Sequence, residues 1–209
     1  MGELGGWERA NWFGAPGSSP QYEYAFGHQN WFGNTAEECR AVRDAVALFD
    51  QSSMAKFVVQ GRDACKVLNR LGTAHVDVPI GRIVYTQWLN GRGGIEADLT
   101  VTRLAADRFM VVTSVASHQR DLAWLNEAIG AAFCSVTDVT SGLAMLGVMG
   151  PNSRALLEAV SGEDLGNAVF PFGESREIEI GYGVVRASRI TYVGELGWEL
   201  YIPAEFALH

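Results

Sequence analysis

The sequence has 209 residues, of which 48% are hydrophobic and 19% are charged. A chain of this length and composition can bury a substantial core, which excludes general disorder and is typical of a soluble globular protein. The formal net charge of −8 excludes nucleic acid as a partner, because phosphate binding depends on clustered Lys and Arg side chains.

The N-terminal segment, residues 1–50, combines an aromatic-rich region with one helix. Its first 34 residues show neither helical nor strand periodicity, and they carry eight large aromatic side chains. We expect an ordered coil whose rings pack on the core, because disordered segments rarely hold so many large apolar groups. The run Thr35–Glu38 is a capping box, which predicts the start of a helix that ends before Asp50. The apolar face of this helix would be formed by Val42, Ala45, Val46 and Phe49.

Residues 51–140 have the pattern of one α+β unit. A short strand, a turn at Gly61 and a helix with Asp63 as its N-cap come first. The run Asn90–Gly94 is a strong hairpin signal between two strands. The expected elements are strand 57–60, helix 64–71, strands 83–89, 95–103 and 109–113, a helix from near 117, and a closing strand 134–139. This order predicts a split β-α-β arrangement, with helices on one face of an antiparallel sheet.

Residues 141–209 repeat the opening of that unit. The run Leu146–Pro151, followed by a helix through Leu157, repeats the order of strand, glycine and helix, so Gly150 corresponds to Gly61. Alternating strands are expected at 176–180, 184–193 and 198–202. The predicted fold class is therefore α+β, with two related split β-α-β, ferredoxin-like halves that contain antiparallel sheets. The second half is expected to be cut short.

Five stretches carry a resemblance to a known family. Residues Gly6–Phe13, Ala41–Arg43 and Leu48–Ser53 resemble the region that follows the flavin domain in dimethylglycine and sarcosine dehydrogenases. Residues Gly93–Val101 and Tyr192–Leu200 resemble the two folate-site motifs that those proteins share with the glycine-cleavage T-protein, an aminomethyltransferase. The resemblance covers essentially the whole chain and implies a T-protein-like folate-binding fold. It also implies a truncated chain, since the family continues into a C-terminal barrel-like domain that is not expected here.

Asp98 is the first candidate site residue. Alternation along its strand places Ile95, Ala97, Leu99 and Val101 on the packing face. Asp98 therefore points away from that face, and Tyr85 on the partner strand of the hairpin can reach the same ligand. The resemblance implies that Asp98 contacts the reactive part of the pterin and stabilises positive charge during transfer. Taken alone, the pattern also fits a solvated or hairpin-capping aspartate and a half-buried sheet tyrosine.

The second folate-site motif supplies further candidates. Alternation in the last strand places Glu199 and Tyr201 on the face opposite its apolar side chains. The resemblance assigns pterin contacts to Tyr192 and Glu199, and a carboxylate suits the amino and ring N–H donors of a pterin. Glu195, in the turn before the strand, is the last candidate, and it fits a solvated turn equally well.

Neither a metal site nor a flavin site is expected. The three cysteines, Cys39, Cys65 and Cys134, and the four histidines lack ligand spacing, which predicts buried free thiols. No Gly-x-Gly-x-x-Gly fingerprint opens a βαβ unit. No apolar stretch approaches the roughly 20 residues that cross a bilayer, and the N-terminus lacks the regions of a secretory signal. We therefore expect no membrane contact and a cytoplasmic location.

The resemblance implies a tetrahydrofolate-dependent domain for one-carbon (aminomethyl or formaldehyde) transfer. Its expected partners are folate, a methylated amine or iminium donor, and a flavin-dependent oxidase or dehydrogenase domain or subunit that demethylates a methylated glycine. Two alternatives stay open. One is a folate-binding relative with another methyl donor, or with a role in RNA modification or iron–sulfur assembly. The other is a non-catalytic fragment that packs against a partner.

Overall fold

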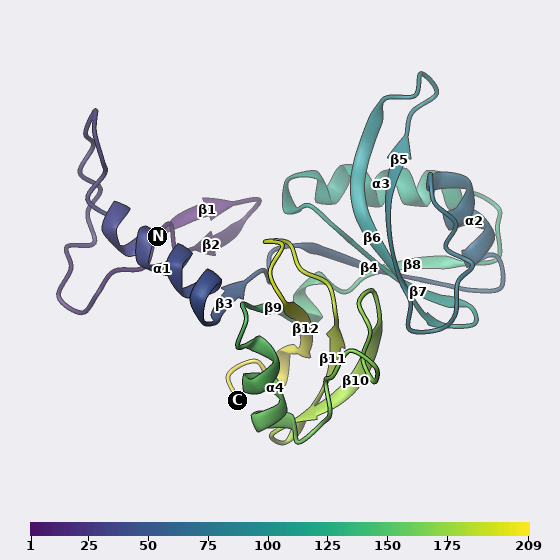
Figure 1. Cartoon of the computed structure of the whole chain (residues 1–209). Helices are drawn as coiled ribbons and strands as arrows, with labels where there is room; N and C mark the ends of the chain where they lie inside the picture. Colours follow the sequence, from purple (N-terminus) through teal and green to yellow (C-terminus); the bar gives the residue numbers. More distant parts are fainter.

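The computed structural model describes all 209 residues, as two five-stranded sheets, four α-helices and an N-terminal hairpin (Figure 1). The helices are α1 (Phe32–Asp44), α2 (Ala64–Leu71), α3 (His118–Ile129) and α4 (Ser153–Ser161). The strands are β1 (Gly2–Leu4), β2 (Trp7–Arg9), β3 (Ala47–Asp50), β4 (Ala55–Gln60), β5 (Ile83–Leu89), β6 (Ile95–Ala105), β7 (Arg108–Thr113), β8 (Ser135–Asp138), β9 (Leu143–Met149), β10 (Ser175–Ile180), β11 (Gly183–Ser188) and β12 (Gly197–Pro203). Short 3-10 turns lie at Val115–Ser117, Thr140–Gly142 and Ala204–Phe206.

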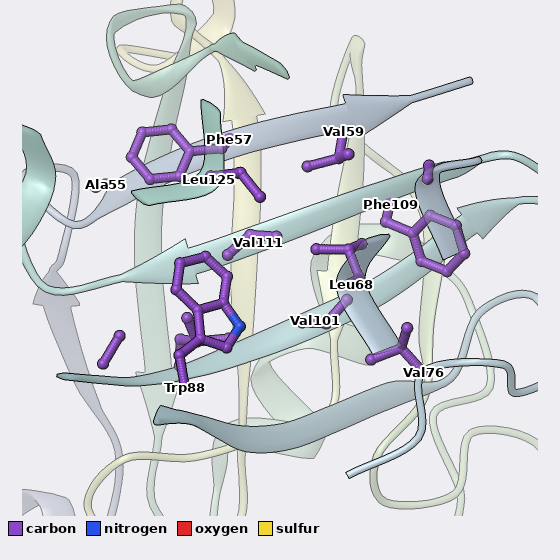
Figure 2. Packing of buried hydrophobic residues seen from close by; sticks show 13 residues of the cluster. Ala55, Phe57, Val59, Leu68, Val76, Trp88, Val101, Phe109, Val111 and Leu125 are labelled. Atoms are coloured by element: carbon purple, nitrogen blue, oxygen red, sulfur yellow. The ribbon is translucent and has the colours of Figure 1, made fainter. Parts of the chain in front are cut away.

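The first sheet has the strand order β5-β6-β7-β4-β8, and every neighbouring pair is antiparallel. Helices α2 and α3 cover one face of it, because their apolar stripes supply Leu68 and Leu125 to its core. These side chains pack against Phe57, Trp88 and other inward residues of the strands (Figure 2). This half is the split β-α-β unit predicted above, with β5 as an additional edge strand.

The second sheet has the order β10-β11-β12-β9-β3, again with antiparallel neighbours. Its core contains Leu157 from α4 and Trp198 from β12. The ring of Trp198 meets that of Phe170 edge to face, with 6.2 Å between the ring centroids. Helix α4 therefore covers this sheet in the way that α2 covers the first one.

The two sheets meet through the faces that the helices leave free. Met110 and Val112 of β7 pack against Met145 of β9 and Tyr201 of β12. Strand alternation explains this arrangement, because Val111, between the first two residues, belongs to the core under α2 and α3. The fold is thus layered as helices, sheet, sheet and helix, and any cavity between the sheets is walled by both halves.

The internal repeat that the glycine pattern predicted is confirmed in detail. Gly61 and Gly150 both have positive φ, +138° and +131°, and follow β4 and β9 directly. Two residues later, the amide of Asp63 donates to the carbonyl of Phe133, and that of Asn152 donates to the carbonyl of Ala45. The α+β class with antiparallel sheets is therefore confirmed. No barrel is present among the 209 residues.

The helix predicted to end before Asp50 is shorter and starts earlier than expected. It spans Phe32–Asp44, with Trp31 as its N-cap, and Thr35 makes no capping hydrogen bond. Residues Ala47–Asp50 instead form β3, which pairs with β9 in the second sheet. The prediction was wrong because a short apolar run fits both periodicities, and the pairing partner of β3 lies about a hundred residues away.

Strand β3 gives the second sheet the same number of strands as the first. It occupies the position that β8 holds beside β4, and each of the two strands follows a helix, α1 or α3. By sequence β3 belongs to the expected segment 1–50, whereas by pairing it belongs with the expected segment 141–209. The division into 1–50, 51–140 and 141–209 stays a prediction as a description of domains.

The aromatic N-terminal region was expected to pack on the core, and it does not. No residue before Ser53 is fully buried. The rings stack on one another instead, as Tyr22 does on Tyr24 and His28 on Phe32. Figure 1 shows α1 and the coil before it extending away from both sheets, whereas the turn of the β1-β2 hairpin points back toward the first half. Strand β3 ties this part of the chain to the second sheet, together with the hydrogen bond from the Asn152 amide to the carbonyl of Ala45 at the end of α1.

Candidate functional site

A cavity of about 950 Å³ lies between the two sheets. Its walls come from both halves of the fold, from the β3-β4 connection and from the loops that precede β10 and β12. The polar and aromatic lining residues are Arg9, Gln51, Ser53, Arg82, Tyr85, Asp98, Thr100, Ser114, Phe172, Thr191, Tyr192 and Glu199. Four of the five predicted site residues are therefore brought together, although they come from four different parts of the chain.

The first sheet contributes Asp98 and Tyr85. Both lie on the face opposite the core under α2 and α3, as strand alternation predicted. Gln87 is directly across from Asp98, and its Nε2 donates to Asp98 Oδ1 over 3.3 Å. The same carboxylate raises the pKa of the neighbouring Tyr85 above its ordinary value. Asp98 is thus exposed to the cavity and held by Gln87 on β5.

The second sheet contributes Glu199, a buried carboxylic acid. Only 8% of Glu199 is exposed, and burial raises the pKa of its carboxyl to about 7. The hydroxyl of Tyr201 donates to Glu199 Oε2 over 2.8 Å, and this hydrogen bond opposes part of the effect of burial. Near neutral pH, Glu199 can therefore exist both as an acceptor and as a neutral acid.

The loops contribute two exposed aromatic rings. Tyr192, in the loop before β12, is 85% exposed, and Phe172, in the loop before β10, is 62% exposed. Large apolar rings that stay exposed at a cavity are available to stack on a flat ligand. Phe172 was missed by the sequence reading because the segment before β10 carries no periodic pattern.

Gln51 is a second residue that the sequence reading missed as a site residue. It lies in the resembling stretch Leu48–Ser53, and this location was the signal that could have identified it. Its Oε1 atom is buried and has no protein donor. The side chain passes over Gly147, where an added Cβ would come within 2.9 Å of that oxygen. A buried acceptor without a partner at a cavity wall is suited to a ligand N–H group.

Lys56 holds the β3-β4 connection, which carries Gln51, through two hydrogen bonds. This lysine is fully buried, and its Nζ donates to the carbonyl oxygens of Ser52 and Met54 at 2.9 and 2.8 Å. Burial lowers the pKa of Lys56 to about 8. Lys56 thus fixes the backbone of a cavity wall without lining the cavity itself.

Glu195 does not join the other predicted residues. It is absent from the cavity walls, and its carboxylate lies 3.7 Å from the guanidinium of Arg43 on α1. Two other arginines, Arg9 and Arg82, line the cavity. Arg9 donates to the carbonyl of Asp50, and Arg82 donates to the carbonyl of Phe172 at 3.2 Å. The cavity therefore contains groups of both charges.

No group of three or more potential metal ligands is present in the structure, and no helix is long and apolar enough to cross a membrane. The absence of bound metal and flavin stays a prediction. The three cysteines are free, as predicted, but Cys39 is exposed and the other two are only partly buried. The prediction of buried thiols was wrong for Cys39 because α1 does not pack on a core.

Comparison with known proteins identifies relatives over the whole chain. The family model described as "GCVT N-terminal domain" matches residues 1–209. The chain is 47% identical to 4-methylaminobutanoate oxidase (formaldehyde-forming) of Paenarthrobacter nicotinovorans, covering 100% of this chain and 25% of that protein. It is 36% identical to mitochondrial dimethylglycine dehydrogenase of Homo sapiens, covering 96% of this chain and 23% of that protein. The chain thus spans about a quarter of the length of these relatives.

Solved structures agree with the fold. Aminomethyltransferase T of the glycine cleavage system from Bartonella henselae is 28% identical, with a TM-score of 0.75 over 90% of this chain and 51% of that chain. A chain of the heterotetrameric sarcosine oxidase from Corynebacterium sp. U-96 has a TM-score of 0.63 at 20% identity, over 84% of this chain and 85% of that chain, and it supports the fold alone.

Proposed function

Because this chain belongs to the GCVT N-terminal domain family, we propose that it binds a reduced folate, tetrahydrofolate, in the cavity between its two sheets and takes part in one-carbon transfer. The cavity has the size of ordinary small-molecule sites, which range from roughly 300 to 1,000 Å³. Its walls combine flat apolar surfaces with a few polar groups, which is the usual composition of such sites.

One observation carries the proposal. Two carboxylates, Asp98 and Glu199, line the same cavity as Gln51, whose buried Oε1 has no protein donor. A reduced pterin presents amino and ring N–H donors on a flat, partly apolar body, so three acceptors together with the rings of Tyr85 and Tyr192 match both its polarity and its shape. A buried acceptor without a protein donor, such as Gln51 Oε1, is costly, and a ligand with donors removes that cost.

The residues have separable chemical roles. Tetrahydrofolate, when bound, supplies amine nitrogens that accept a one-carbon unit at the oxidation level of formaldehyde. Asp98, as an exposed carboxylate, stabilises positive charge that develops near those nitrogens. Glu199, with a pKa raised to about 7, accepts hydrogen bonds from the pterin edge when it is ionised. Tyr192 stacks and excludes water.

We propose an N-methylated amino acid as the source of the carbon. The names of two relatives give 4-methylaminobutanoate and dimethylglycine as their substrates, and both compounds carry an N-methyl amine and a carboxylate. A flavin-dependent oxidase or dehydrogenase domain would release the carbon next to this domain. The exposed aromatic N-terminal region is available to contact such a partner. The cytoplasmic location stays a prediction, since the relatives include mitochondrial proteins.

A thermal titration tests the folate assignment. Ligand binding to the native state must raise the melting temperature, so folinic acid, a stable reduced folate, should raise it progressively with concentration. The control compound is p-aminobenzoylglutamate, which shares the tail of folinic acid but lacks the pterin and should have little effect. A folded protein that shows neither a thermal shift nor a heat of binding with saturating folinic acid would contradict the proposal and favour a non-catalytic role in packing.

A further inference from the structure

Glu199 and Tyr201 form a buried polar pair on β12. They lie two residues apart, so strand geometry turns both side chains to the same face of the sheet. Glu199 is 8% exposed and Tyr201 is 3% exposed, and the Tyr201 hydroxyl donates to Glu199 Oε2 over 2.8 Å. Glu199 lines the cavity of about 950 Å³, whereas Tyr201 does not. The pair therefore joins a residue at the cavity wall to one behind it.

The internal repeat provides a comparison for this pair. Val59 and Val148 are corresponding residues of β4 and β9, and they lie opposite Phe109 and Trp198 in the neighbouring strands. The same register makes Met110 the counterpart of Glu199 and Val112 the counterpart of Tyr201. Met110 and Val112 are fully apolar and pack in the contact between the sheets. The packing of the sheets is thus achieved in the first half without any polar group at these two positions.

In the second half, the corresponding positions hold an acid and a phenol. Burying these polar groups costs free energy. Taking a carboxylate out of water disfavours its charged form unless hydrogen bonds compensate. The residues opposite Glu199 give no such help, because they are Gly147 on β9 and Ser188 on β11, and the Ser188 hydroxyl donates to Ser175. Tyr201 is the one protein donor that the structure gives to this carboxylate.

We propose that Tyr201 is a positioning residue, whose hydroxyl holds one carboxylate oxygen of Glu199 so that the other oxygen faces the cavity as a fixed acceptor for the ligand. The inference rests on the proposed folate site, and it adds a residue that does not line that site. Fixing the carboxylate before the ligand arrives lowers the ordering cost of binding. The hydroxyl also favours the ionised form of Glu199, which is the form that accepts from ligand donors.

Few charged side chains lie near Glu199 and Tyr201. Arg9, Arg82 and Asp98 line the same cavity, from β2, from the segment before β5 and from β6. Behind the pair, Arg186 lies opposite Tyr201 on β11, and its guanidinium is paired with Glu177 at 2.7 Å. The raised pKa of Glu199 has burial as its main cause, and the hydrogen bond from Tyr201 acts against it. Removing the hydroxyl alone should therefore change the titration of Glu199.

The test compares wild type with Tyr201→Phe, which removes one oxygen and keeps the ring. Carboxyl-labelled glutamate, observed by NMR with Glu199→Gln to assign the signal, reports the titration of Glu199 without any folate. We expect the Glu199 pKa to rise in Tyr201→Phe. Affinity for folinic acid should then fall about fivefold at pH 7 and recover much of this loss at about pH 9, where Glu199 is again ionised. Tyr24→Phe, at an exposed position, is the matched control and should leave both measurements unchanged.

The outcomes separate the two claims. A wild-type protein that binds no folinic acid contradicts the proposed function, and the NMR titration still decides whether Tyr201 controls Glu199. Unchanged titration of Glu199 in Tyr201→Phe overturns the positioning role, and so does a loss of affinity that is equal at every pH. If Tyr201→Phe does not fold, 3-fluorotyrosine introduced at position 201 keeps the shape and makes the hydroxyl a stronger donor. The Glu199 pKa should then fall, and an unchanged value would contradict the proposal.

Discussion

Asp98 on β6 and Glu199 on β12 face one cavity from two different sheets. Their environments differ, because Asp98 is exposed and hydrogen-bonded by Gln87, whereas Glu199 is buried and its pKa is raised to about 7. Two carboxylates in contrasting environments can have different roles toward one ligand, one electrostatic and one as an adjustable acceptor.

Asp98→Asn should weaken folate binding without weakening the fold. The side chain is exposed and has only surface partners, so the free energy of unfolding should change by less than about 0.5 kcal/mol. Loss of a charged hydrogen bond to the ligand should cost about 1.5–3 kcal/mol of binding free energy, which calorimetry can measure. Asp107→Asn, in the exposed turn before β7, is the control. Equal affinities in the two variants would return Asp98 to a solvated or capping role.

Glu199→Gln should change how stability depends on pH. The folded-state pKa of about 7 lies above the ordinary value of 4.5, so between these values the folded protein keeps a proton that the unfolded chain has lost. Wild-type stability should therefore fall as the pH rises from about 4.5 to about 7, by up to about 3 kcal/mol.

The variant lacks this group, so its stability should be nearly constant over the same window. Urea unfolding at several pH values measures the difference between the two proteins, with Glu205→Gln at an exposed position as the control. Parallel curves for wild type and Glu199→Gln would show that Glu199 ionises normally in the folded protein.

Gly61→Ala and Gly150→Ala should be similarly destabilising, because the two glycines occupy equivalent positions. An added Cβ would lie 2.4 Å from the carbonyl oxygen of Phe133 at the first site and 2.5 Å from that of Ala45 at the second. With positive φ at both positions, we expect a loss of about 3 kcal/mol or more in the free energy of unfolding. Gly91→Ala has open space around it and should change little. A small effect at either repeat position would argue against the equivalence.

Tyr192→Ala should reduce affinity while leaving stability unchanged. The ring is 85% exposed, so its removal exposes little new surface. If it stacks on the pterin, the loss should be about 0.5–1.5 kcal/mol of binding free energy beyond the lost contact area, and Tyr192→Phe should keep most of the affinity. Fluorescence titration with folinic acid compares the two variants. Tyr192→Ala binding as tightly as wild type would remove this residue from the site.

The sequence alone predicts most of the strands of the first half. Strand β5 was predicted at its observed bounds, and β6 and β7 differ from the predicted bounds by two residues or fewer, because alternation and the Asn90–Gly94 turn are local signals. The positions of Asp98 and Glu199 on the free faces of their strands follow from the same alternation.

The remaining features depend on contacts that are distant in the sequence. Strand β3 pairs with β9, about a hundred residues away, and nothing within 47–50 distinguishes it from the end of a helix. Phe172 reaches the cavity through a loop without periodicity. Tyr201 was placed on the same face as Glu199, but the hydrogen bond between them depends on the exclusion of water by both sheets. The salt bridge that draws Glu195 to Arg43 is likewise a tertiary contact.

The most direct test of the central claim is a calorimetric titration of folinic acid into three proteins. These are wild type, the double variant Asp98→Asn with Glu199→Gln, and a matched double variant, Asp107→Asn with Glu205→Gln. We predict that wild type and the matched variant bind equally, and that the site variant binds about a hundredfold more weakly or not at all while it stays folded. No heat with folded wild type, or equal affinity in all three proteins, would contradict the claim that Asp98 and Glu199 form a folate site.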